Sequence, residues 1–186
     1  MNQKIISKDP IIYEYDSVFD LKICNEIIEI SKPGLVDSTT LDLAKTQYRN
    51  SSSVDFVTGE IPQVDYVINS LISLSRYTHD DYDPAQVTCY SEGGEYLPHF
   101  DSYQRLNKDS MQRTTTYIVY LNDGFIGGET YFPKIDMEVL PKAGKVLMIR
   151  NCFENSEHTH PYSLHQSKKI KSGYKYILTI WAKDKF

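Results

Sequence analysis

Residues 113–121 read RTTTYIVYL, a run of β-branched and aromatic side chains that ends at Asn122-Asp123. Runs of this kind are typical of β-strands. Six further runs between residue 85 and the end of the chain share this character, and Gly, Pro, Asn or Asp separates them: QVTCY (86–90), EYLPHF (95–100), ETYFP (129–133), MEVL (137–140), KVLMIR (145–150) and YKYILTIW (174–181). Many short strands without helices between them predict a sandwich or a barrel, including jelly rolls.

The first third of the chain has a helical periodicity instead. Apolar side chains recur at roughly helical spacing in residues 17–32, with Asp16 or Ser17 as the expected cap and Pro33-Gly34 as the expected end. A second helix is expected over residues 62–74, where several apolar side chains share one face.

The segment between these two helices, residues 37–59, is polar and rich in Ser and Thr, so we expect a loop with short extended pieces. Because the sequence has neither an internal repeat nor an interdomain linker, residues 1–186 are expected to form a single domain. The predicted fold is α+β and mainly β: a double-stranded β-helix (jelly roll) core with the N-terminal helices packed on its outside.

Composition excludes several classes of protein. Of the 186 residues, 40% are hydrophobic, and the formal net charge is −5. The tightest basic cluster is Lys168, Lys169 and Lys171, so nucleic acid is not expected as a partner. An odd count of 3 cysteines argues against a disulfide scaffold. Without a signal peptide, or the roughly 18 apolar residues of a membrane span, the chain is expected to be soluble and cytoplasmic, with no membrane partner.

The sharpest chemical feature is His99-Phe100-Asp101. In a strand, residues two apart point to the same face, so His99 and Asp101 can converge on one ion. An imidazole and a carboxylate suit Fe(II), and a second, distant histidine completes a facial triad with three coordination sites open. Taken alone, the H-x-D motif is weak, because a strand-edge histidine bonded to a neighbour has the same sequence.

Four histidines compete to be the third ligand. His79 lies in a polar loop, and His158 and His160 lie in a polar turn that could mimic a metal site. His165 enters the last polar stretch before the final strand. It is followed ten residues later by Lys175, which opens an apolar strand.

A lysine at the start of an apolar strand needs a partner or a route to water. It can hold the far carboxylate of a cosubstrate that has two carboxylates, as a buried and paired cation. Alternatively, Lys175 can extend from the strand end into solvent. The position of Lys175 at the start of an apolar strand favours the first interpretation, and a lysine that opens such a strand ten residues further on distinguishes His165 from the other three histidines.

These residues resemble the prolyl 4-hydroxylase family of Fe(II)/2-oxoglutarate-dependent oxygenases, over about residues 11–181. The order and spacing of several blocks carry the resemblance: QVTCYSEGGEYLPHFD, RTTTYIVYLND, GGETYFP, PKAGKVLMIRN, and the final His165, Gly173, Lys175 and Trp181. The segment after His165 reads QSKKIKSG, where the family commonly has a small residue and a Pro-Val pair, so the substrate preference is open.

The resemblance implies an enzyme with a procollagen-proline 4-dioxygenase-like activity. It implies Fe(II), 2-oxoglutarate as cosubstrate, O2, and ascorbate as reductant, with 4-hydroxylation of prolyl residues in a peptide or protein. The iron ligands implied are His99, Asp101 and His165. Lys175 is implied as the partner of the distal 2-oxoglutarate carboxylate.

Further roles are implied around this centre. Tyr90 and Thr130 are implied as hydrogen-bond partners of the cosubstrate. The substrate side of the pocket is implied to include Tyr96, Arg113, Trp181 and, near the peptide groove, Arg49. Each of these also has an ordinary alternative: the aromatic residues can belong to the core, Arg113 can be a surface charge, and Gly127-Gly128 can be a simple turn.

Two alternatives to this function stay open at the level of sequence. One is a related oxygenase that acts on lysyl residues, a free amino acid or a small molecule. The other is a non-catalytic jelly-roll binding module. We also expect the two polar loops, residues 37–59 and 102–112, to close over a bound substrate. The oligomeric state is left open.

Overall fold

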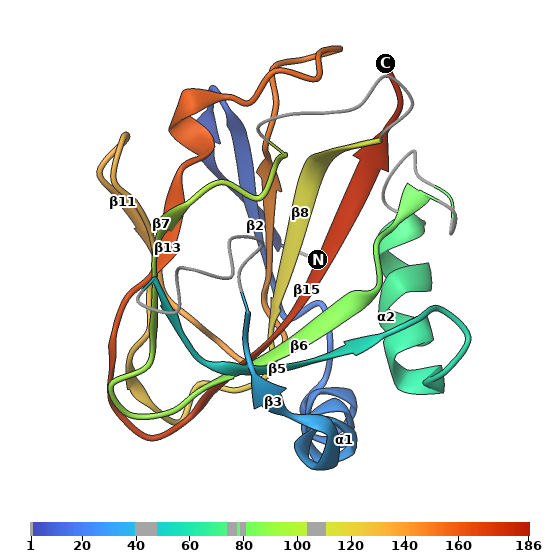
Figure 1. Cartoon of the computed structure of the whole chain (residues 1–186), viewed down its shortest axis with the longest axis vertical. Helices are drawn as coiled ribbons and strands as arrows, with labels where there is room; N and C mark the ends of the chain where they lie inside the picture. The colour runs from blue at the N-terminus through green and yellow to red at the C-terminus, as the bar shows by residue number, and fades with distance from the viewer. Residues whose placement is uncertain (1, 40–47, 74–77, 79–80, 104–110) are drawn as a thin grey trace.

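Two antiparallel sheets face each other in this computed structural model, which describes residues 2–39, 48–73, 78, 81–103 and 111–186 (Figure 1). Within this part of the chain, the larger sheet has eight strands in the order β1 (Asn2–Lys8), β2 (Ile11–Asp16), β12 (Val146–Arg150), β8 (Gln112–Tyr120), β15 (Lys175–Asp184), β6 (Ala85–Tyr90), β5 (Ser52–Phe56) and β3 (Val36–Asp37). The smaller sheet has the order β11 (Met137–Val139), β10 (Thr130–Phe132), β13 (His165–Ser167), β7 (Glu95–His99) and β4 (Arg49–Asn50). A short pair joins β14 (Ile170–Ser172) to β9 (Ile126–Gly127).

The two helices cover the outer face of the larger sheet. Helices α1 (Leu21–Ser31) and α2 (Pro62–Ile72) lie on the opposite side of this sheet from β7, β11 and β13 (Figure 1). Because side chains alternate along a strand, β8 contributes to two cores. Val119 packs in the cluster with the helices, whereas Ile118 and Tyr120 pack in the cluster between the sheets. The jelly-roll core with helices outside is therefore confirmed.

All seven runs of β-branched and aromatic residues between residues 86 and 181 form strands: β6, β7, β8, β10, β11, β12 and β15. Strands β1 and β2 form a hairpin at the edge of the larger sheet, and periodicity did not identify them. In residues 37–59, β4 and β5 are the short extended pieces expected there, and residues 40–47 lie outside the described part of the chain.

The expected helix cap was wrong. Asp16 ends β2, and Ser17 has a φ of 53° in the turn that follows. The amide nitrogens of Val18 and Phe19 then donate to the carbonyl of Gly144, which fixes the chain before the helix starts. Asp20 is the cap instead, because its carboxylate accepts the backbone N–H of Ile23 at 2.9 Å.

Both helices are also shorter than expected. A short 3-10 turn, Lys32–Gly34, follows α1 at the expected Pro-Gly end. Helix α2 ends at Ile72 rather than Leu74, which lies outside the described residues. None of the described helices has the length and apolar character that crossing a membrane would require.

Candidate active site

Three side chains that can bind a metal converge between the two sheets. His99 ends β7, His165 begins β13, and the two residues lie directly opposite each other in the antiparallel register. Asp101 follows β7 by two residues, and its carboxylate oxygens lie 3.5 Å from Nε2 of each histidine. One ligand atom from each residue falls within 4.8 Å of the others. An imidazole–carboxylate–imidazole set with this spacing fits a facial triad.

Backbone carbonyls orient both imidazoles. Nδ1 of His99 lies 2.9 Å from the carbonyl oxygen of Leu97, and Nδ1 of His165 lies 2.9 Å from that of Ser163. These bonds place the proton on Nδ1, so Nε2 of each ring keeps its lone pair for a cation. The ring of Tyr96 stacks on His99 with 3.5 Å between centroids, which holds the imidazole plane.

The pKa values of Asp101 and His165 favour the protonation states that bind a cation. Burial alone raises the pKa of Asp101, but the proximity of His165 and His99 and a hydrogen bond from Thr116 outweigh burial and hold this pKa well below its usual value. Burial lowers the pKa of His165 to about 4. At neutral pH the cluster is therefore an ionised carboxylate with a neutral imidazole at His165, which are the forms that bind metal.

Lys175 is the buried cation expected from the sequence. Its side chain is 1% exposed, and Nζ donates to the carbonyl oxygen of Gly128 at 2.6 Å and to Oγ of Ser167 at 2.8 Å. Burial lowers its pKa to about 7, and the more distant charge of Glu129 offsets this only in part. Among the described residues Lys175 forms no ion pair, so a carboxylate ligand would supply the missing charge.

One cavity of about 40 Å³ joins this lysine to the metal-binding cluster. Tyr90 and Thr130 also line it. The hydroxyls of Thr130 and Tyr120 lie 2.7 Å apart, and burial raises the pKa of Tyr90 to about 12, so Tyr90 is a neutral phenol. Metal ligands and a buried cation in one small cavity fit a short dicarboxylate that binds the metal with one end.

A wider groove of about 610 Å³ opens onto the same cluster. His99 and Asp101 line both the groove and the small cavity. Arg113 donates from Nε to Asp83 at 2.6 Å and lies 4.1 Å from the centre of the Trp181 ring. The wall of the groove therefore carries a guanidinium held on an indole.

Arg49 and Tyr96 form another part of the groove wall. Nη2 of Arg49 donates to Gln86 at 2.8 Å and to Thr88 at 3.0 Å, and its guanidinium lies 5.0 Å from the centre of the Tyr96 ring. The structure thus brings together all ten residues that the sequence analysis assigned to the site. They line the small cavity, the groove or both: Arg49, Tyr90, Tyr96, His99, Asp101, Arg113, Thr130, His165, Lys175 and Trp181.

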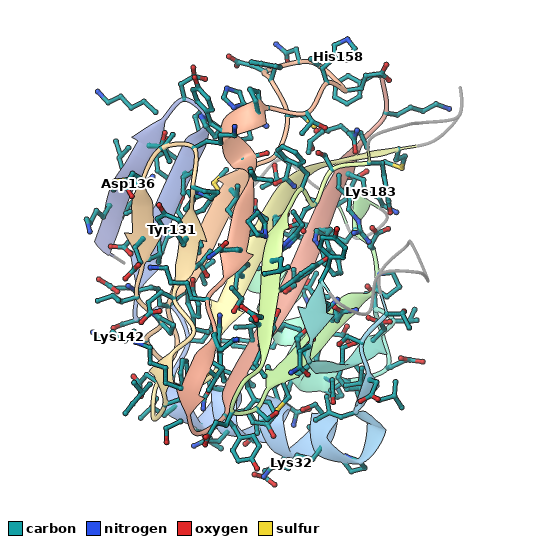
Figure 2. The ribbon with its side chains drawn as sticks, turned by 60° about the vertical axis from the view of Figure 1, so that its left-hand side comes forward. Lys32, Tyr131, Asp136, Lys142, His158 and Lys183 are labelled. Carbon is teal, nitrogen blue, oxygen red and sulfur yellow. The ribbon has the colours of Figure 1, made fainter. Side chains whose placement is uncertain are left out.

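The other histidines lie elsewhere or outside the description. His158 is at the rim of the molecule (Figure 2). His160 is buried, and its Nε2 lies 2.9 Å from Asp9. His79 falls outside the described residues, as do residues 104–110 of one loop expected to close over the substrate.

Sequence reasoning missed several contributors. Gly128 was read as a turn, yet its carbonyl holds Lys175, and Asp83 and Ser167 were not singled out. Thr116 and Asn151 also lie behind Asp101, joined by hydrogen bonds. Thr116 follows two other threonines in β8, and Ser167 ends the polar strand His165–Ser167, so neither residue stands out in the sequence from polar residues that only complete the core.

Comparison with known proteins agrees with this geometry. The family model of the 2OG-Fe(II) oxygenase superfamily matches residues 85–183. A protein of Acanthamoeba polyphaga mimivirus named "Putative prolyl 4-hydroxylase" is 30% identical, over 87% of this chain and 69% of the viral protein. The rat prolyl 4-hydroxylase subunit alpha-1 is 28% identical over 96% of this chain, which spans only 35% of the rat protein.

Solved structures show the same fold. A viral collagen prolyl hydroxylase from Paramecium bursaria Chlorella virus-1, in complex with 2OG, matches with a TM-score of 0.78 at 24% identity, covering 92% of this chain and 95% of that one. A prolyl-4-hydroxylase of Pseudomonas putida matches with a TM-score of 0.69 at 14% identity, covering 94% and 93%.

A jelly roll that brings a His–Asp–His cluster and a buried lysine into one cavity defines an Fe(II)- and 2-oxoglutarate-dependent oxygenase. Within that superfamily, the chain belongs to the prolyl 4-hydroxylase family.

Proposed function

We propose that this protein hydroxylates prolyl residues at the 4-position in a peptide or protein, while 2-oxoglutarate and O2 are converted to succinate and CO2. Family membership supports the reaction class. The names of the relatives support the prolyl substrate: prolyl 4-hydroxylases in a virus and in rat, and a collagen prolyl hydroxylase among the solved structures. The observation that carries the proposal is the cavity shared by the His–Asp–His cluster and Lys175.

In this proposal His99, Asp101 and His165 hold Fe(II). The two Nε2 atoms and the carboxylate come from one strand pair and the turn after it, so the fold fixes all three before a metal arrives. When bound, iron with 2-oxoglutarate and O2 supplies the oxidising chemistry. Ascorbate serves as the reductant that keeps iron in the ferrous state.

Lys175 orients the cosubstrate because its ammonium group is the counterion of the distal carboxylate. Its Nζ is already held by Gly128 and Ser167, so little side-chain freedom is lost on binding. Tyr90 and Thr130 add neutral hydroxyl groups to the cavity wall. The small volume excludes bulk water from the reacting end of the site.

The groove receives the substrate. Tyr96, Trp181, Arg113 and Arg49 present aromatic faces and guanidinium groups along it. A proline-rich peptide arrives as a preformed extended helix and suits an aromatic-lined groove. Because the groove volume of about 610 Å³ is larger than a free amino acid needs, a peptide substrate is favoured over free proline. Lysyl peptides remain the second candidate, since the groove itself does not select the side chain.

Succinate release is the test, measured with Fe(II), ascorbate and 2-oxoglutarate in the presence of proline-rich peptides, lysine-containing peptides or free proline. We expect stimulation by the proline-rich peptides alone, and loss of turnover in His165→Ala. Stimulation by the lysine-containing peptides or by free proline would move the substrate assignment to the alternative. Absence of turnover in iron-loaded protein would favour a non-catalytic binding module.

A further inference from the structure

The three proposed metal ligands are not oriented in the same way. Backbone carbonyls of Leu97 and Ser163 fix the two histidines, and no side-chain substitution removes a carbonyl. Asp101 instead depends on a side chain, because the hydroxyl of Thr116 donates to its Oδ2 at 2.7 Å. Thr116 stands in the middle of β8, so this bond links the larger sheet to the metal-binding cluster.

Asn151 directs the proton of that hydroxyl. Its Nδ2 lies 2.8 Å from Oγ1 of Thr116, and an amide nitrogen can only donate. The Thr116 hydroxyl therefore accepts from Asn151 and gives its single proton to Asp101. Thr116 and Asn151 are both 0% exposed, so water does not compete for either bond.

The Asn151 side chain keeps this orientation although its Oδ1 is buried without a hydrogen-bond partner among the described residues. With the amide turned over, Oδ1 would face Thr116 and draw its proton away from Asp101. The carboxylate would then meet a hydroxyl lone pair. The orientation in which Oδ1 has no partner is thus the one in which the Thr116 hydroxyl can donate to Asp101.

The backbone of Asn151 is fixed on several sides. Its N–H donates to the carbonyl of Thr114 at 2.9 Å, and its carbonyl accepts from the N–H of His160 at 2.8 Å and from Oγ of Ser163 at 3.1 Å. Ser163 is the residue whose own carbonyl orients His165. Asn151 therefore lies behind two of the three proposed ligands.

We infer that Thr116 and Asn151 are positioning residues, which hold the carboxylate of Asp101 in the orientation where it faces both Nε2 atoms. The inference rests on the proposed metal site and adds to it the residues that preorganise the one ligand not fixed by the backbone. Partners of metal ligands typically change metal affinity by about 10–100-fold when they are lost.

The test measures metal binding rather than turnover. Metal-free protein is titrated with Mn(II), and free Mn(II) is counted by electron paramagnetic resonance. Thr116→Val keeps the shape but removes the hydroxyl, and we expect the dissociation constant to rise by about 10–100-fold. Thr116→Ser keeps the hydroxyl, and its dissociation constant should stay within about threefold of the original protein.

A matched control comes from the same strand. Thr114 is also buried, and its hydroxyl donates to Asp184 at 2.6 Å rather than to a proposed ligand. Thr114→Val should therefore lose a similar buried hydrogen bond without weakening Mn(II) binding. Near-ultraviolet circular dichroism of each metal-free variant shows that the fold is retained.

Asn151→Leu provides a second route if Thr116→Val does not fold. We expect it to weaken Mn(II) binding in the original protein and to have no further effect in a Thr116→Val background. The inference fails if folded Thr116→Val binds Mn(II) as tightly as the original protein. It also fails if Thr116→Ser or Thr114→Val weakens Mn(II) binding as much as Thr116→Val does. A third contrary result is that Asn151→Leu weakens Mn(II) binding by the same factor in the Thr116→Val background as in the original protein. Absence of Mn(II) binding by the original protein would contradict the proposed metal site itself.

Discussion

Nζ of Lys175 donates a 2.6 Å hydrogen bond to the carbonyl oxygen of Gly128, although the two residues are far apart in sequence. Gly128 has a φ of 71°, a backbone conformation that glycine adopts without strain. The turn that the sequence indicated at this position therefore places a backbone acceptor against a buried cation. This contact and the one to Ser167 leave the ammonium group in the cavity ready for a carboxylate.

Gly128→Ala should destabilise the protein. A Cβ at this position would lie 2.4 Å from Cδ1 of Ile170 and 3.0 Å from Cδ of Lys175. Together with the positive φ, this should lower the free energy of unfolding by about 1–3 kcal/mol. Gly124→Ala is the matched control, because a Cβ there meets nothing within 4 Å. Urea unfolding of both variants checks this, and equal stability for the two would contradict it.

Removing the Lys175 charge should weaken cosubstrate binding selectively. Lys175→Met keeps the apolar stem but leaves the distal carboxylate without a counterion, so the dissociation constant of 2-oxoglutarate should rise by about two orders of magnitude, or about 3 kcal/mol. Calorimetric titration of 2-oxoglutarate into Mn(II)-loaded protein measures this constant. Lys168→Met removes a surface charge that pairs with Glu138, and it should leave the constant unchanged. Equal affinities in Lys175→Met and the original protein would rule out the proposed role of Lys175.

Cosubstrate binding should depend on pH through the same lysine. Burial lowers the pKa of Lys175 to about 7 in the free protein, and only the protonated form attracts a carboxylate. Affinity for 2-oxoglutarate should therefore be steady below about pH 7 and fall as pH rises above it, by at most about tenfold per pH unit. The same titration from about pH 6 to about pH 9 tests this. An affinity that stays constant or increases over that range would show that Lys175 keeps its proton without the ligand.

Arg113→Ala should weaken binding of the peptide and leave binding of 2-oxoglutarate unchanged. The guanidinium is held by Asp83 and stacks on Trp181 at the groove wall, outside the lining of the small cavity. We expect KM for a proline-rich peptide to rise by about tenfold while KM for 2-oxoglutarate stays unchanged. Steady-state kinetics with each substrate varied in turn separates the two. A parallel rise in both constants would indicate a general distortion of the site.

Sequence patterns were sufficient for the main elements of the fold. Runs of β-branched and aromatic residues such as RTTTYIVYL identified the central strands. Such side chains are common there because strand β8 is buried on both faces, between two cores. Strand β1 was not predicted, since Asn2–Lys8 mixes polar and apolar residues at an edge strand, and periodicity alone did not identify β2. The cap of α1 was misplaced because a tertiary contact, Gly144 against Val18 and Phe19, decides where the helix starts.

The H-x-D motif and the position of Lys175 at the start of an apolar strand pointed to the site, and the resemblance to the prolyl 4-hydroxylase family implied the full ligand set. The supporting residues of the site could not be proposed in this way. Thr116 and Asn151 are far apart in sequence and resemble ordinary core residues, and only the pairing of β12 with β8 brings them together. Gly128 carries no side chain, so its interaction with Lys175 has no sequence signal beyond a turn.

The central claim is tested most directly by tandem mass spectrometry of a proline-rich peptide after turnover under ¹⁸O2. We predict the addition of one heavy oxygen atom on a prolyl residue, with 4-hydroxyproline as the product after hydrolysis, and no addition in His165→Ala. Label on a lysyl residue, or 3-hydroxyproline as the product, would contradict the proposed reaction, as would an unmodified peptide from iron-loaded protein that still consumes 2-oxoglutarate.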